Sequence, residues 1–126
     1  MIKEITQTQT TYQVAARFDE LAQQEKWFEI QDELFANNVR SVEPNNSPYL
    51  NNVEGKEAVR QKGKDWVARI EQVHKLHTSK PVVCGNHFAV GRSFDITVKG
   101  LGNVRIDELM VYEVQDGQIT AEQFFY

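Results

Sequence analysis

The sequence predicts an α+β fold in which helices cover one face of an antiparallel β-sheet. Two observations lead to this prediction. Apolar residues recur at helical spacing in the first part of the chain, and they alternate along extended segments after about residue 73. The 126 residues include 40% apolar side chains and contain no repeat, low-complexity tract or internal linker. We therefore expect one compact domain over residues 1–126, with residues 1–7 as a flexible N-terminus.

Three helices are expected in the first part. The first has the apolar stripe Val14, Phe18, Leu21 and Ala22, and the threonine cluster over residues 8–11 is available as its cap. Residues 23–25 separate it from a second helix, which carries Trp27, Ile30 and Leu34 and ends at Asn37-Asn38. The third helix begins at Gly55, and its expected buried stripe is Val59, Trp66, Val67, Ile70 and Val73.

The other segments are typical of strands. A short β-branched strand is expected over residues 39–43, and a loop rich in proline and asparagine follows over residues 44–52. Longer strands are expected over residues 73–84, 88–98, 104–114 and 119–126. Asp116-Gly117 indicates a hairpin turn between the last two, because both turn positions favour positive φ.

Composition excludes several classes of protein. A net charge of −4 argues against a nucleic-acid-binding protein, and no apolar run approaches the about 18 residues of a membrane span. The first residues lack the basic and apolar regions of a signal peptide, so a cytoplasmic location is expected. Cys84 alone cannot form an internal disulfide. His74 and His77 would meet at a metal only if the third helix continued through them, so neither a metal nor another cofactor is expected.

Three charged residues interrupt the apolar series of the expected strands: Arg92, Glu108 and Glu122. Ionised side chains are rarely buried without partners, so these residues either pair with one another or line a cavity. Arg92 would then hold a ligand carboxylate or enolate, or pair with Glu108 or Glu122. The two glutamates are expected to face each other across the hairpin, where paired carboxyls can divide into an acid and a base.

Five segments occur together in an order and spacing that are fairly specific for one fold. They are residues 16–21 (ARFDEL), 34–38 (LFANN), 42–44 (VEP), 54–59 (EGKEAV) and 111–119 (VYEVQDGQI). In these segments the chain resembles the SnoaL-like branch of the nuclear-transport-factor-2-like superfamily. The resemblance implies three N-terminal helices packed on a curved mixed or antiparallel sheet, which forms a cone with an internal pocket.

The resemblance also implies which side chains meet a ligand. The ligand-binding candidates are Phe18, Phe35, Trp66, Phe94, Glu108, Met110, Glu122, Phe124 and Tyr126. Leu109, Val111 and Phe125 would lie on the outer sheet face, where this superfamily commonly forms homodimers.

Two enzyme families of the superfamily can be compared residue by residue. Glu43 before Pro44 looks like the catalytic base of ketosteroid isomerase, but Phe18 and Met110 stand where that enzyme has oxyanion-hole donors, and neither can donate. Polyketide cyclases of the SnoaL type are similar in overall layout and use a histidine–aspartate pair. Here Glu113 stands near the histidine position, and the sequence stops at Tyr126 before an equivalent aspartate. Neither mechanism is expected with the families' own residues.

Three functions remain open. The first is a cofactor-independent isomerase, cyclase or dehydratase acting on a small apolar carbonyl compound, with Glu43 as base and Arg92 as electrostatic stabiliser. In the alternative, Glu43 has a structural role only and forms an ion pair with Arg40 or a lysine. The second function is a homodimeric binder of small apolar, carbonyl-bearing or weakly acidic molecules without catalysis. The third is an interaction module whose exposed sheet face contacts a different protein.

Overall fold

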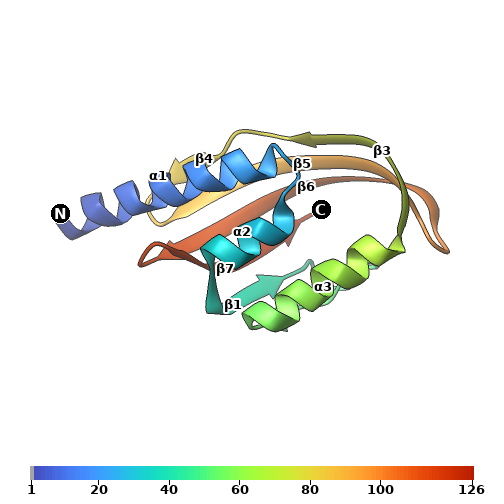
Figure 1. Ribbon diagram of the computed structural model, residues 1–126, viewed down its shortest axis with the longest axis horizontal. Coiled ribbons are helices and arrows are strands. Elements are labelled where there is room, and N and C mark those ends of the chain that lie inside the picture. Colours follow the sequence, from blue (N-terminus) through green and yellow to red (C-terminus); the bar gives the residue numbers. More distant parts are fainter. Residues whose placement is uncertain (1) are drawn as a thin grey trace.

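The computed structural model describes the backbone of residues 2–126 and the side chains of residues 10–126. Three helices lie on a mixed sheet, as predicted (Figure 1). They are α1 (Ile2–Ala22), α2 (Trp27–Leu34) and α3 (Lys56–Arg69). The predicted stripe of α1 is buried, since the exposed fractions of Val14, Phe18, Leu21 and Ala22 are all 5% or less. The expected flexibility of residues 1–7 stays a prediction; α1 begins at Ile2, and Met1 lies outside the described residues.

The sheet contains every described strand. They are β1 (Phe35–Val42), β2 (Val53–Glu54), β3 (Ile70–Thr78), β4 (Val82–Cys84), β5 (His87–Val98), β6 (Gly102–Gln115) and β7 (Gln118–Phe125). The order is β2-β1-β7-β6-β5-β3, and β4 pairs with β5. The pair of β1 with β7 is parallel and the other pairs are antiparallel, so the sheet is mixed.

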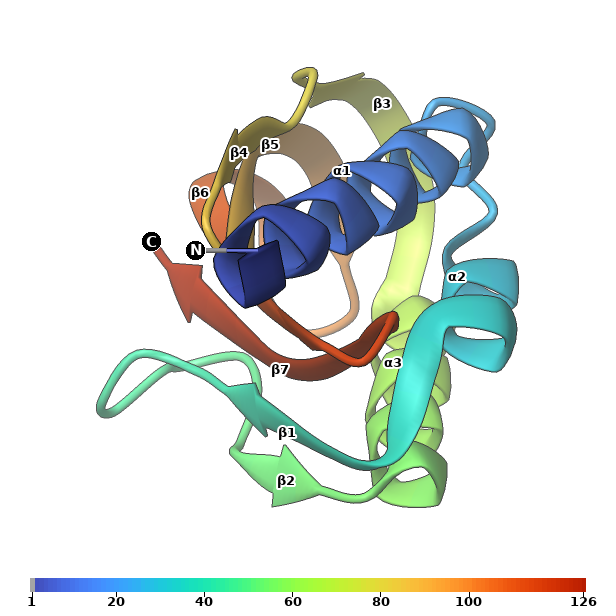
Figure 2. The same ribbon diagram turned by 90° about the vertical axis from the view of Figure 1, so that its left-hand side faces the viewer.

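The helices divide the inner face of the sheet between them. In Figure 2 the strands curve around α1, while α3 lies beside β1 and β2. Helix α1 contacts β4, β5 and β6, and α3 contacts β1, β2 and β3. An aromatic cluster fills the space under α1: the Phe18 ring lies 5.1 Å from that of Phe88 and 4.7 Å from that of Tyr112. The space between α3 and the sheet has no such cluster, and the cavity described below lies there.

Several predicted element boundaries are wrong. The threonine cluster over residues 8–11 lies within α1 and does not cap it. Asn37-Asn38 does not end the second helix, because α2 ends at Leu34 and both asparagines belong to β1. The expected strand over residues 73–84 is two strands, β3 and β4, with a break between Thr78 and Val82.

The third helix is shorter than predicted. It ends at Arg69, so that Ile70 and Val73 belong to β3, and of its predicted stripe only Val59 is buried. Val67 and Val73 are about half exposed, at 53% and 51%. Both residues line the cavity, which explains why these two apolar side chains are exposed and not part of the core.

The hairpin between β6 and β7 forms as predicted. Asp116 has φ 51° and Gly117 has φ 77°, so both turn positions take the positive φ that the sequence indicated. None of the described helices combines the length and the apolarity needed to cross a bilayer.

Candidate functional site

A cavity of about 600 Å³ lies between α2, α3, the loop after β1 and the inner face of the sheet. Its wall is mainly aromatic and aliphatic, and it holds a few charged groups. Seven of the nine predicted ligand-binding residues line it: Trp66, Phe94, Glu108, Met110, Glu122, Phe124 and Tyr126. Glu43 and Arg92 line it as well, so the structure brings both candidate catalytic residues into one cavity.

The other two predicted residues, Phe18 and Phe35, do not line this cavity. Phe18 is fully buried in the aromatic cluster under α1, and Phe35 is 3% exposed at the start of β1. Both belong to the main hydrophobic core. The inward direction was correct for Phe18 and Phe35, but α1 and the start of β1 lie at the filled end of the sheet.

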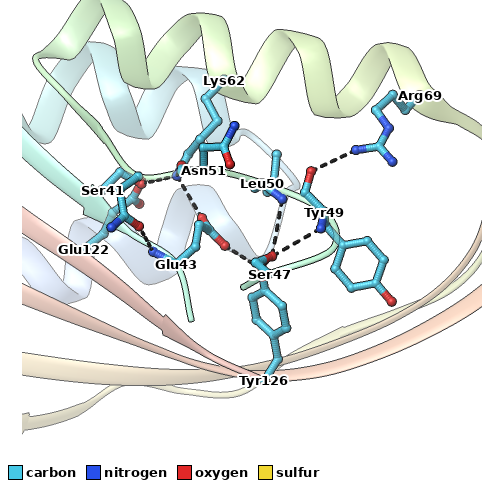
Figure 3. A network of polar contacts seen from close by, with 11 residues as sticks. Ser41, Glu43, Ser47, Tyr49, Leu50, Asn51, Lys62, Arg69, Glu122 and Tyr126 are labelled. Atoms are coloured by element: carbon cyan, nitrogen blue, oxygen red, sulfur yellow. Dashed lines mark hydrogen bonds and ion pairs between the residues drawn. The ribbon is translucent and has the colours of Figure 1, made fainter. Parts of the chain in front are cut away.

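Lys62 of α3 lies on the cavity wall, where it contacts Glu43 and Ser41 directly and Glu122 through Ser41 (Figure 3). Its ammonium donates to Glu43 Oε2 at 2.8 Å and to Ser41 Oγ at 2.6 Å. Ser41 Oγ donates onward to Glu122 Oε2 at 2.7 Å. The side chains of Lys62 and Glu43 are only 10% and 2% exposed, so this is a buried ion pair. Of the two structural partners foreseen for Glu43, the lysine is present; Arg40 lies instead 3.7 Å from Glu113.

Tyr126 provides a second hydrogen-bond donor to Glu43. Tyr126 donates its hydroxyl to Glu43 Oε1 at 2.7 Å and also contacts the hydroxyl of Ser47 (Figure 3). Ser47 Oγ in turn accepts hydrogen bonds from the backbone of the loop at Tyr49 and Leu50. Both Glu43 oxygens therefore have a donor from the protein itself, and the same contacts connect the loop to the end of the chain.

Arg92 is paired with a residue that the sequence did not indicate. Its guanidinium donates to both carboxylate oxygens of Glu25, at 2.8 and 3.2 Å, and to Thr78 Oγ1 at 2.7 Å. It also lies over the rings of Trp27, at 4.5 Å, and Phe94, at 5.1 Å. The predicted direct pairing with Glu108 or Glu122 is wrong, because Glu25, just after α1, reaches the guanidinium instead. Burial alone would raise the pKa of Glu25, but the hydrogen bonds from Arg92 and Trp27 hold it below its ordinary value.

Glu108 has no such partner. It stands opposite Arg92 in the β5–β6 ladder, yet no side chain of residues 10–126 donates a hydrogen bond to its carboxyl. Burial raises the pKa of Glu108 to about 8; the charge of Glu43 acts in the same direction, and that of Arg92 opposes it. A carboxyl in this state keeps its proton at neutral pH and can still release it near that pH.

Glu122 is the third carboxyl of the cavity. Burial raises its pKa to about 7, although the hydrogen bond from Ser41 and the charge of Lys62 both lower it. It pairs across the ladder with Tyr112, so the prediction that Glu108 and Glu122 stand opposite each other across the hairpin is wrong. The reason is that they lie at different distances from the turn: Glu108 is eight residues before Asp116, whereas Glu122 is five residues after Gly117. Both carboxyls nevertheless lie on the inner face, and the charge of Glu122 further raises the pKa of Glu108.

The histidines do not form part of the site. Helix α3 ends before His74 and His77, and His74 Nε2 lies 2.7 Å from the hydroxyl of Thr97. Within the described part of the chain, no three His, Cys, Asp or Glu side chains gather where they could hold a metal ion. Cys84 is exposed at the end of β4.

Comparison with known proteins supports the fold and its family. The profile of the SnoaL-like domain matches residues 9–126. One similar solved structure, from Mesorhizobium loti, is described as a SnoaL-like polyketide cyclase and also as a carbohydrate phosphatase. It is 34% identical to this chain, with a TM-score of 0.85. The match covers 91% of this chain and 97% of that one. No curated protein matches this chain significantly.

More distant structures share the fold. A nuclear-transport-factor-2-like protein of unknown function from Burkholderia pseudomallei is 16% identical, with a TM-score of 0.73 and coverage of 93% and 90% of the two chains. A protein with a ketosteroid isomerase-like fold from Catenulispora acidiphila, solved with trimethylamine, is 20% identical, with a TM-score of 0.62 and coverage of 77% and 72%.

Proposed function

Because this chain belongs to the family of SnoaL-like domains, whose fold carries both enzymes and plain binders, we propose its function from the cavity rather than from the fold. We propose that the cavity binds a small, largely apolar molecule and that Glu108 moves a proton on it. The reaction would be of the isomerase, cyclase or dehydratase type and needs no cofactor.

One observation carries this proposal: the Glu108 carboxyl faces an apolar cavity without a hydrogen-bond donor from residues 10–126. General acid–base catalysis works best when the pKa of the catalytic group lies near the working pH, and the pKa of Glu108, about 8, does. As carboxylate, Glu108 would take a proton from the carbon next to a carbonyl and give an enolate. As carboxylic acid, it would return that proton to another atom of the ligand.

Glu43, the base expected from the sequence, has a different role in this proposal. Each of its oxygens already accepts a hydrogen bond, from Lys62 or from Tyr126, whereas no side chain of residues 10–126 donates one to Glu108. Glu43 instead acts on Glu108 through its charge, which helps to raise the pKa of Glu108. Arg92 remains an electrostatic stabiliser, but its guanidinium is held by Glu25 and Thr78.

Hydrogen exchange on a small ketone tests the proposal directly. Protein in D₂O is mixed with α-tetralone, and NMR follows deuterium entering the carbon next to the carbonyl. The wild-type protein should accelerate this exchange, and the rate should rise with pH and level off above about 8 as Glu108 ionises. Glu108→Gln should lower the rate at least about a hundredfold, as is usual on removal of a general base. Asp107→Asn, on the exposed side of the same strand, is the matched control.

A non-catalytic binder is the second candidate, and one observation favours it. Met110 lines the cavity and Phe18 lies in the core, at the two positions where a ketosteroid isomerase would supply hydrogen-bond donors. If the protein is only a binder, tetralone binds but its hydrogen exchange stays at the rate of the buffer. Glu108→Gln then changes neither the affinity for tetralone nor the exchange rate.

We also propose that the chain forms a homodimer through its outer sheet face. Leu109 and Phe125 are register neighbours on β6 and β7, are 45% and 48% exposed, and lie beside Val111. Exposed apolar patches of this kind commonly mark protein–protein contacts. A different protein partner on the same face is the alternative, and a cytoplasmic location stays a prediction.

A further inference from the structure

The carboxyl groups on the cavity wall outnumber its cationic groups. In the described chain the wall carries four carboxyl groups, those of Glu25, Glu43, Glu108 and Glu122, and only two cationic groups, those of Lys62 and Arg92. Each cation already has a carboxylate of its own: Lys62 holds Glu43 at 2.8 Å, and Arg92 holds Glu25 at 2.8 Å. Glu108 and Glu122 are therefore left without a cation.

From this imbalance we propose that the ligand carries a protonated amine on an apolar body, and that Glu108 and Glu122 provide its counter-charge. This inference rests on the proposed function, since it names the class of molecule that the same cavity binds. Glu122 accepts one side-chain hydrogen bond within residues 10–126, from Ser41, and Glu108 accepts none. The unused hydrogen-bonding capacity at these two residues suits a donor such as an ammonium group.

The aromatic wall suits the same chemistry. Trp66, Phe94, Phe124, Tyr49 and Tyr126 line the cavity, and an aromatic ring face attracts a cation that approaches it. The protein already uses these rings in this way: Arg92 lies 5.1 Å from the centre of Phe94, and Lys62 lies 5.4 Å from that of Phe124. An ammonium beside Glu108 would find both a carboxylate and aromatic surface.

An anionic ligand fits less well. A ligand carboxylate would have to displace Glu25 from Arg92 or Glu43 from Lys62, and so leave a carboxylate in the cavity without its cation. It would also meet Glu108 and Glu122. We therefore propose a cationic ligand, in place of the ligand carboxylate that the sequence analysis expected Arg92 to hold.

Three probes of nearly equal shape and different charge test the inference: naphthylmethylamine, naphthylmethanol and naphthoate. Each is titrated into the wild-type protein at neutral pH in a calorimeter. The amine should bind at least about tenfold more tightly than either of the others, since a hydrogen bond to a charged group contributes about that much. Glu108→Gln should lower the affinity for the amine much more than that for the alcohol and so remove most of this preference, whereas Asp107→Asn should preserve it.

Proton release provides a second readout that needs no variant. A nearby ammonium lowers the pKa of a carboxyl group, and Glu108, with its pKa at about 8, is mostly protonated at neutral pH in the empty cavity. Titrations of the amine in buffers of different ionisation enthalpy should therefore show release of up to one proton for each amine bound.

The outcomes separate this inference from the proposed function. Equal or tighter binding of the alcohol or the carboxylate, or uptake of protons with the amine, would overturn the inference while tetralone exchange still supported proton transfer. No binding of any probe, together with no exchange, would overturn both.

Discussion

At the scale of single residues, Glu108 has a carboxyl group that folding makes harder to ionise. The pKa of Glu108 is about 8 in the folded chain and about 4.3 in an unstructured peptide. Between these two values the folded state binds more protons than the unfolded state at this position, so the contribution of Glu108 to stability falls as pH rises. Above about pH 8 this contribution becomes constant.

We therefore predict that Glu108→Gln stabilises the protein in a pH-dependent way. The gain in the free energy of unfolding should be small near pH 4 and should grow to a few kcal/mol at pH 8, because the amide has no charge to desolvate. Urea denaturation at a series of pH values measures it. A constant difference between the two proteins across this range would contradict the prediction.

A second prediction concerns the buried pair on the cavity wall. Lys62→Met leaves Glu43 buried without its ammonium, and breaking such a pair costs about 3–5 kcal/mol of unfolding free energy. Lys64→Met, at an exposed position of the same helix, should cost less than about 0.5 kcal/mol. Combining Lys62→Met with Glu43→Gln should recover part of the loss; a loss as large as the single variant's would show that the ion pair is not its cause.

The sequence indicated which residues are unusual but not how they pair. Alternation along the strands singled out Arg92, Glu108 and Glu122 as charged groups within apolar series, and the family resemblance placed them on the inner face. Their contacts come from elsewhere in the chain: Glu25, after α1, pairs with Arg92, and Lys62 of α3 reaches Glu122 only through Ser41. Such contacts depend on how the helices lie across the sheet, and no local pattern in the chain encodes that.

At the scale of elements, the β6–β7 turn tests the clearest local signal in the sequence. Gly117 has φ 77°, and a Cβ built there would meet Thr10 Cγ2 only at ordinary contact distance, 3.5 Å. Gly117→Ala should therefore cost about 1–2 kcal/mol of unfolding free energy through backbone conformation rather than through a clash. Asp116→Asn should be neutral or slightly stabilising, because asparagine also accepts positive φ. Equal losses in the two variants would contradict this explanation.

The end of α3 was wrongly predicted because a cavity, not a packed core, lies beside it. Where a cavity replaces the core, apolar residues no longer mark the buried side of an element. Val67, at the end of α3, and Val73, in β3, continue the apolar spacing of a helix, but they lie at the cavity edge and the chain changes from helix to strand between them.

At the scale of the whole molecule, the outer sheet face should decide the oligomeric state. Leu109→Glu places a charge in the proposed dimer contact and should weaken association at least about tenfold, because like charges meet across a twofold interface. Light scattering coupled to size-exclusion chromatography measures the mass. Leu101→Glu, at a similarly exposed leucine in the β5–β6 turn, is the control, and a monomeric wild-type protein would contradict the dimer.

The proposed chemistry depends on a cavity carboxyl group, that of Glu108, which exchanges its proton near neutral pH. Carbon-detected NMR of the side-chain carboxyl signals tests it most directly, with the Glu108 signal assigned by its absence in Glu108→Gln. This signal should titrate near pH 8; a midpoint of about 4.3, the value of glutamate in an unstructured peptide, would show that Glu108 is not shifted.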